Sequence, residues 1–134
     1  VGVPQHMWLT EVNSKVSSWC LDIGRCTAGF PGSIGLATSF NRTMWRQKGD
    51  IFATEMRALN NVRWRREAGE YGEEFGGKNV GHEQIGLSAF GPNINIVRDP
   101  RFGRNSELAG EDPLLAGEYA TEVVRGMQAP DAAG

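Results

Sequence analysis

A polar stretch at residues 98–112 holds the residues best suited to chemistry. Three arginines and four acidic residues fall between two apolar segments there: Arg98, Arg101, Arg104, Asp99, Glu107, Glu111 and Asp112. Charges at this density can pair with one another and simply brace a loop. They can also form a ligand site, because an arginine fork and a carboxylate together hold several hydroxyl groups. The residues alone favour the self-paired loop and leave the ligand site open.

Other residue types that could do chemistry are sparse. The two histidines, His6 and His82, stand far apart in the sequence, and no glycine-rich phosphate-binding motif occurs, so we expect neither a metal nor a cofactor. Cys20 and Cys26 are close enough in sequence for a disulfide, but they could equally be two free thiols. Asn41 begins a glycosylation sequon, although a helix-capping role is the preferred interpretation.

Composition limits the classes of partner. The chain has 134 residues, 40% of them hydrophobic, and a net charge of −2, which suits a single globular domain. A nucleic-acid partner is disfavoured because acidic residues cancel the basic cluster at residues 63–66. No run of about 18 apolar residues suggests a membrane span. The start at Val1 and the loose C-terminal tail, Ala-Pro-Asp-Ala-Ala-Gly, make a fragment plausible.

Helices are expected on both sides of the polar stretch. The first covers residues 42–60, with Asn41 as N-cap and an apolar stripe of Trp45, Phe52, Met56 and Leu59. Gly49 weakens that expectation slightly. The second begins at Asp112-Pro113, a favourable N-cap and first position, and stops near Gly126. Its apolar face comprises Leu115, Ala116, Tyr119, Ala120, Val123 and Met127.

Two short apolar runs, residues 34–38 and 94–97, are expected to be strands. Residues 61–84 are rich in glycine and charge and predict a solvated loop or insertion. Strands that alternate with helices predict an α/β fold with a parallel sheet. In such folds chemistry lies in loops after the strands, and residues 98–111 form such a loop.

The sequence from residue 92 to 128 reads PNINIVRDPRFGR followed by NSELAGEDPLLAGEYATEVVRGMQ. It closely resembles glycoside hydrolase family 3, whose first domain carries P-N-I-N-I-x-R-D-P-R-W-G-R and then G/S-E-D-P. Residues 37–45 are similar to the family's A-A-S-F-N-x-x-L-W, residues 55–58 to its E-x-R-A, and residues 8–11 to the W-x-x-E of its xylosidase branch. The resemblance covers nearly the whole chain and is weakest at 61–84.

The resemblance implies that residues 1–134 form the N-terminal portion of an incomplete (β/α)₈ barrel, with 61–84 as an insertion. The activity implied is retaining, exo-acting hydrolysis of terminal β-linked sugars, most of all β-xylosides, without cofactor or metal. The implied partners are an oligosaccharide or β-glycoside substrate and the rest of the barrel. The family is typically secreted or extracellular, which favours a Cys20–Cys26 bridge.

Site roles follow from the same resemblance. The last arginine of the family motif binds sugar hydroxyls and falls on Arg104, while the early acidic residue that contacts the same sugar falls on Glu11. Glu107 is expected to brace Arg104. Arg98, Asp99 and Arg101 are expected to fix the loop by ion pairs.

Departures from the family pattern concern the surroundings of these residues. Phe102 replaces the usual tryptophan, and Ser14 and Lys15 replace the His-Gly that follows the early glutamate, which puts the geometry around Glu11 in question.

No catalytic residue is expected in this chain. The family's nucleophilic aspartate and its sugar-binding Lys-His pair follow later in the sequence, and a barrel takes roughly 250 residues. A different interpretation is a truncated, non-catalytic remnant that binds sugar weakly or packs against another protein.

Overall fold

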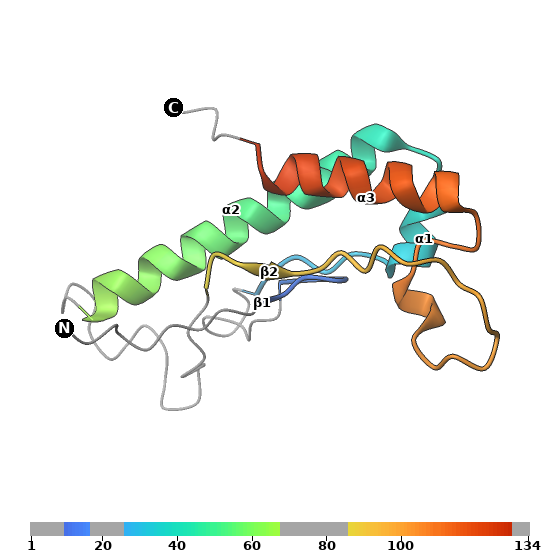
Figure 1. Cartoon of the computed structure of the whole chain (residues 1–134). Helices are drawn as coiled ribbons and strands as arrows, with labels where there is room; N and C mark the ends of the chain where they lie inside the picture. Colours follow the sequence, from blue (N-terminus) through green and yellow to red (C-terminus); the bar gives the residue numbers. More distant parts are fainter. Residues whose placement is uncertain (1–9, 17–25, 68–85, 130–134) are drawn as a thin grey trace, which may run out of the picture.

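Two long helices lie on one side of a short sheet and a long loop (Figure 1). The computed structural model describes residues 10–16, 26–67 and 86–129. In chain order its elements are β1 (Thr10–Glu11), α1 (Ser33–Ala37), α2 (Arg42–Glu67), β2 (Ala89–Phe90), the 3₁₀ turn η1 (Asn105–Glu107) and α3 (Pro113–Met127). Among these described elements, no helix is long and apolar enough to cross a membrane.

The sheet consists of β1 and β2, which pair in parallel with Thr10 opposite Ala89 and Glu11 opposite Phe90. Parallel neighbours need a crossover connection, and α1 and α2 lie within it. Each strand is therefore followed along the chain by helix, which is the α/β order expected from the sequence.

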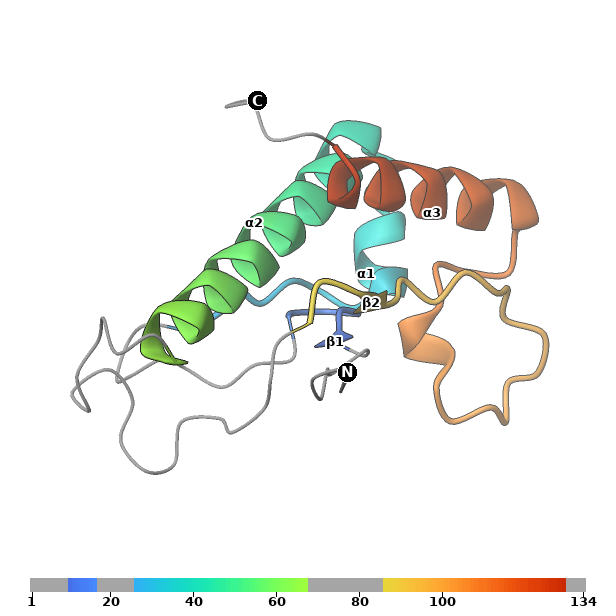
Figure 2. The same cartoon turned by 60° about the vertical axis from the view of Figure 1, so that its left-hand side comes forward.

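The strand expected at residues 34–38 is wrong, because Ser33–Ala37 form helix α1. Its first turn is closed by the Leu36 N–H, which donates to the Gly32 carbonyl at 3.0 Å. An apolar run of this length fits either a buried strand or a buried helical turn. Leu36 and Ala37 are buried, and α1 lies beneath the crossing of α2 and α3 (Figure 2).

The strand expected at residues 94–97 is also absent from the described sheet. The Ile96 N–H is taken by the Asn95 side chain at 2.9 Å, and the Val97 N–H donates across the loop to the Gly110 carbonyl at 2.9 Å. Local partners thus replace a strand ladder. Strand β2 lies earlier, at Ala89–Phe90.

Helix α2 confirms the first predicted helix and extends it. The Asn41 side chain accepts from the Met44 N–H at 3.1 Å, and Trp45, Phe52 and Met56 are buried as the stripe predicted. The helix continues to Glu67, so the loop predicted from residue 61 is wrong over its first seven positions. The rest of that predicted insertion lies outside the described residues.

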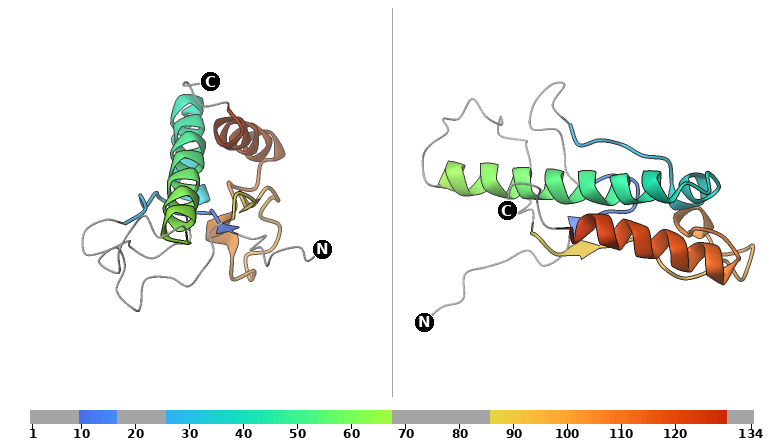
Figure 3. Two further views of the ribbon diagram at one scale, coloured as in Figure 1. Left: turned by 90° about the vertical axis from the view of Figure 1, so that its left-hand side faces the viewer. Right: turned by 90° about the horizontal axis from the view of Figure 1, so that it is seen from above.

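Helix α3 begins as predicted. The Asp112 carboxylate accepts from the Leu114 and Leu115 N–H groups, and Pro113 occupies the first helical position. Ala116, Tyr119 and Val123 are buried on the expected face. The two long helices run in the same general direction and pack against each other (Figure 3).

Apolar contacts divide into two clusters. One gathers around Trp45 and Tyr119, whose rings meet edge to face at 5.7 Å between centroids. The other joins Val12 and Val16, after β1, to Phe52 and Met56 on α2. Met127 packs against both clusters, so the segment after β1 and the loop before α3 are anchored to one helical layer.

Candidate functional site

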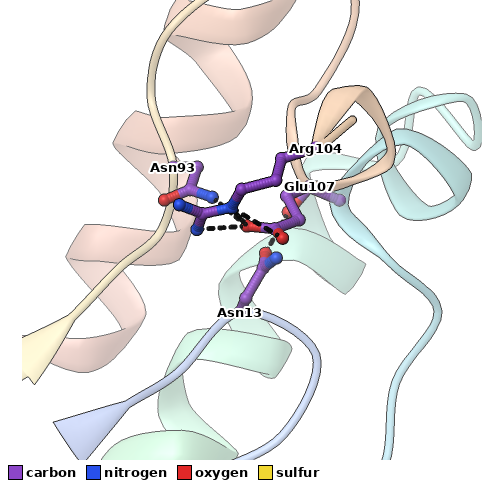
Figure 4. Close-up of polar contacts among 5 residues, drawn as sticks. Asn13, Asn93, Arg104 and Glu107 are labelled. Atoms are coloured by element: carbon purple, nitrogen blue, oxygen red, sulfur yellow. Dashed lines mark hydrogen bonds and ion pairs between the residues drawn. The ribbon is translucent and has the colours of Figure 1, made fainter. Parts of the chain in front are cut away.

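Arg104 and Glu107 form the central pair of the candidate site. The Arg104 Nε–H lies 2.9 Å from both carboxylate oxygens of Glu107, and its Nη2 lies 2.5 Å from Oε2 (Figure 4). Arg104 precedes η1 and Glu107 ends it, so one tight turn of the backbone brings both side chains together. The brace predicted for Arg104 is therefore present as a two-point contact.

The electrostatics follow from this contact. The hydrogen bond from Arg104 holds the pKa of the Glu107 carboxyl below its usual value. The same bond and the charge of Glu107 raise the pKa of Arg104. Both groups are therefore charged across any ordinary working pH.

Asn93 is a further member of the site that the sequence reasoning missed. Its side-chain amide donates to Glu107 Oε2 at 2.7 Å (Figure 4). Asn93 comes three residues after β2, and its amide thereby ties the start of the loop to the η1 turn. Its position inside the 92–104 motif was the only available signal, and nothing in its residue type pointed to Glu107.

Glu11 comes from the other strand. It is the last residue of β1, it is exposed, and its charge contributes to the raised pKa of Arg104 after the larger effects of Glu107. The structure thus brings the two residues expected to bind substrate within electrostatic range of each other, although 92 residues separate them in sequence.

The remaining arginines of the loop differ from one another. Arg101 grips Asp99 through Nε at 3.0 Å and Nη2 at 2.8 Å, and this bond lowers the pKa of the Asp99 carboxyl. Asn105 also donates to the Asp99 backbone carbonyl at 2.9 Å. Asp99 thus braces the loop. Arg98 is exposed and makes no ion pair within the described part of the chain.

Arg104 has hydrogen-bond donors that its contacts with Glu107 do not use. A guanidinium has five N–H donors, and the contacts to Glu107 use Nε and Nη2. The Nη1 hydrogens make no hydrogen bond within the described residues, and the side chain is 56% exposed. An exposed, fixed fork next to a carboxylate suits a ligand with several hydroxyl groups.

Other predicted chemistry is only partly described. Cys26 is disulfide-bonded, whereas Cys20, His6, His82 and the side chains of residues 63–66 lie outside the described residues. Within the described ranges, no cluster of three or more histidine, cysteine, aspartate or glutamate residues could hold a metal ion. Asp112 is occupied as the N-cap of α3.

Several known β-xylosidases are similar to this chain in sequence. No protein-family model matches the chain. A β-xylosidase/α-L-arabinofuranosidase 2 of Medicago sativa subsp. varia is 36% identical over 98% of this chain, and a xylan 1,4-β-xylosidase of Xylanibacter ruminicola is 35% identical over 98%. The chain spans about one-seventh of the length of these relatives, namely 15% and 14%.

A solved structure agrees. The fold superposes with a TM-score of 0.67 and 26% identity on a glycoside hydrolase family 3 exo-β-xylosidase in complex with a xylobiose aziridine activity-based probe, covering 95% of this chain and 14% of that one. The sequence matches and the structural match each cover nearly the whole of this chain. Over the segment that it spans, the chain therefore matches a fragment of glycoside hydrolase family 3.

Proposed function

We propose that the chain is the N-terminal portion of the (β/α)₈ barrel of a retaining, exo-acting β-xylosidase, and that Arg104 and Glu11 bind its terminal sugar. The observation that carries this proposal is the Arg104 fork. Glu107 holds the fork, which keeps free donors, and the pKa of Arg104 is raised by Glu107 and, to a smaller extent, by the charge of Glu11. Glu11 ends β1, and Arg104 lies in the loop that follows β2, the neighbouring parallel strand. Loops that leave strand ends are where barrel enzymes place their sites.

The division of labour follows from donor chemistry. Arg104 stays charged and offers its remaining N–H groups to the oxygens of a sugar, while Glu107 and Asn93 prevent the fork from rotating. Glu11 supplies carboxylate oxygens that accept from sugar hydroxyls. These residues bind and orient the substrate. The two carboxyl groups that a retaining glycosidase needs would come from the remainder of the barrel.

Two features of the structure support the wider proposal. Among the described exposed side chains are Phe90, Ile94 and Phe102, which follow or belong to β2, and further barrel strands and loops would cover such a surface. Cys26 is disulfide-bonded, which suits an oxidising, extracellular location.

The test is hydrolysis of 4-nitrophenyl β-D-xyloside, β-D-glucoside and α-L-arabinofuranoside by the complete protein that carries this chain. We expect the xyloside to be the best substrate and proton NMR to show the β-anomer of xylose first. The 134-residue chain alone should show no turnover, because no nucleophile is expected in it. A complete protein that hydrolyses none of the three would favour the non-catalytic remnant instead. Release of α-xylose first from the xyloside would show an inverting enzyme and overturn the retaining mechanism.

A further inference from the structure

Lys48 occupies an unusual position in the core. It lies on α2 between Trp45 and Phe52, on the same face as the apolar stripe, and its residue is 0% exposed. Buried ammonium groups are normally paired with a carboxylate. Within the described residues Lys48 makes no ion pair, and its Nζ faces the rings of Phe52 and Tyr119 at 5.4 and 5.6 Å. A core of this kind would accept a methionine at a lower cost in free energy.

The amine begins a chain of hydrogen bonds that leaves the core. Lys48 Nζ donates to the Tyr119 hydroxyl at 2.9 Å, and Tyr119 donates to Ser33 Oγ at 3.4 Å, the longest and therefore weakest step. Ser33 donates in turn to Asn13 Oδ1 at 2.8 Å. Lys48, Tyr119 and Ser33 are all fully buried, and they come from three different helices.

The direction of donation is fixed along the chain. The pKa of Lys48 is about 8, so the amine is protonated at pH 7, and an ammonium group has only donors to offer to Tyr119. The Tyr119 hydroxyl then has its own proton for Ser33, and burial raises the pKa of that hydroxyl, which keeps the proton in place. The Ser33 hydroxyl, which already accepts one bond, is left to donate to Asn13.

Asn13, at the far end of this series of hydrogen bonds, lies beside the candidate site. Asn13 is two residues after Glu11, in the bend that turns the backbone away from β1. The neighbouring Ser14 carbonyl accepts from the Phe30 N–H at 2.7 Å, so the bend is also anchored to the segment before α1. The contacts that fix Asn13 therefore also fix the direction of the backbone just after Glu11, the last residue of β1.

We propose that Lys48, Tyr119 and Ser33 form a positioning chain that holds Asn13, and through it the Glu11 carboxylate, in the orientation that contacts substrate. The proposal rests on the proposed function for the part played by Glu11. Lys48 and Tyr119 set the direction of the Ser33 hydroxyl, and Ser33 makes the contact with the bend. None of the three touches the substrate.

The experiment uses five variants of the complete protein, three single and two double, the second double being Ser33→Ala/Tyr119→Phe. Ser33→Ala removes the last donor, Tyr119→Phe removes the middle of the chain, and Lys48→Met removes its origin. The double variant Lys48→Met/Tyr119→Phe leaves no unpaired polar group in the core. Gln47→Met, at an exposed position on the same helix, is the matched control.

Three measurements are made on each variant: thermal unfolding, backbone amide exchange over residues 13–16, and kcat/KM with an aryl β-xyloside. We expect Lys48→Met to unfold no earlier than the wild type at pH 7, because it relieves a buried amine. It should nevertheless exchange faster over 13–16 and lose about two- to tenfold in kcat/KM. Ser33→Ala should show the largest loss, and adding Tyr119→Phe to it should change exchange and kcat/KM no further.

Lys48→Met should therefore lose activity without losing stability, a result that a hydrogen-bond series with a purely structural role would not give. If Lys48→Met and the double variant keep wild-type exchange over 13–16 and wild-type kcat/KM, the chain only satisfies buried polar groups and the proposal is overturned. If the wild-type protein hydrolyses no glycoside, the proposed function fails, while faster exchange over 13–16 still reports whether the chain holds the bend.

Discussion

Gly49 on α2 and Gly126 on α3 mark where the two helices touch backbone to backbone. A Cβ atom at Gly49 would lie 2.1 Å from the Val123 carbonyl oxygen, and one at Gly126 would lie 2.1 Å from the Arg46 carbonyl oxygen. Neither obstacle is a flexible side chain that could move aside. The interhelical distance in this layer is therefore set by two missing side chains, one on each helix.

Replacing either glycine should separate the helices. We expect Gly49→Ala and Gly126→Ala each to lower the free energy of unfolding by about 3 kcal/mol, the upper end of the usual cost of overpacking, since a backbone clash cannot be relieved by a rotamer change. Urea unfolding followed by tryptophan fluorescence measures the loss.

Gly117 provides the matched control for that prediction. It lies on the exposed face of α3, and a Cβ there would meet nothing within 4 Å. Gly117→Ala should stabilise the protein by up to about 1 kcal/mol through helix propensity. Equal effects at the three glycines would show that α2 and α3 are not in backbone contact.

The role of Arg104 can be separated from that of its neighbour Arg101. Arg104→Lys keeps the charge and loses the fork, so under the proposed function it should lower kcat/KM by about one to three powers of ten. Arg101→Lys should have little effect on either activity or stability, because its pair with Asp99 is open to solvent, with Arg101 89% exposed. Steady-state kinetics on an aryl β-xyloside and thermal melts of both variants decide the matter. An Arg104→Lys variant that melts early and keeps its activity would make Arg104 a structural brace alone.

Asn93 should act through Glu107. Asn93→Ala removes one of the hydrogen bonds that lower the pKa of the Glu107 carboxyl, the larger one being that of Arg104. We expect the pKa of Glu107 to rise slightly in carboxyl-carbon NMR titrations, and kcat/KM to fall about two- to tenfold. Asn95→Ala is the control, since within the described ranges the Asn95 side chain hydrogen-bonds only to the adjacent Ile96 N–H. If Asn93→Ala lowers kcat/KM by the same factor in a protein that already carries Glu107→Gln, Asn93 does not act through Glu107.

The parts of the fold that sequence predicted well are those with a local cause. The N-caps Asn41 and Asp112, the apolar stripes and the Arg104–Glu107 pair all depend on residues within a turn or two of one another. The motif match assigned Glu11 and Arg104 to the same sugar, and the structure places Glu11 within electrostatic range of Arg104, a relation that no local pattern could give.

The failures have a shared physical cause, namely contacts distant in sequence. Whether residues 34–38 form a strand or a helix depends on what covers Leu36, and whether 94–97 join a sheet depends on the bond from Val97 to Gly110. The sequence alone marks Gly49 only as a weak point of α2, because the contact that requires a glycine there is made by the backbone of α3. A polar residue on an apolar stripe gives no reason to expect burial, so the burial of Lys48 has only one sequence signal, its spacing from Trp45 and Phe52.

Lys48 also predicts how stability depends on pH. Burial lowers the pKa of its amine from 10.5 to about 8. Between those two values the unfolded chain carries a proton that the folded chain has released, so the free energy of unfolding should rise as the pH increases through this window. The full gain is on the order of 3 kcal/mol. Below about pH 8 the amine is protonated in both states and the cost of burying it is constant.

Comparison with Lys48→Met isolates this effect from every other titrating group. The described groups that face the amine are the Phe52 ring and the Tyr119 ring and hydroxyl, and of these only Tyr119 titrates. Because burial raises the pKa of Tyr119, that residue favours unfolding as the pH rises above about 10. Urea unfolding of both proteins between pH 7 and 10 should therefore show the variant more stable at pH 7, with an advantage that is constant to about pH 8 and then shrinks toward pH 10. A difference between the two proteins that stays constant over this range would mean that Lys48 titrates normally and is not buried as an unpaired amine.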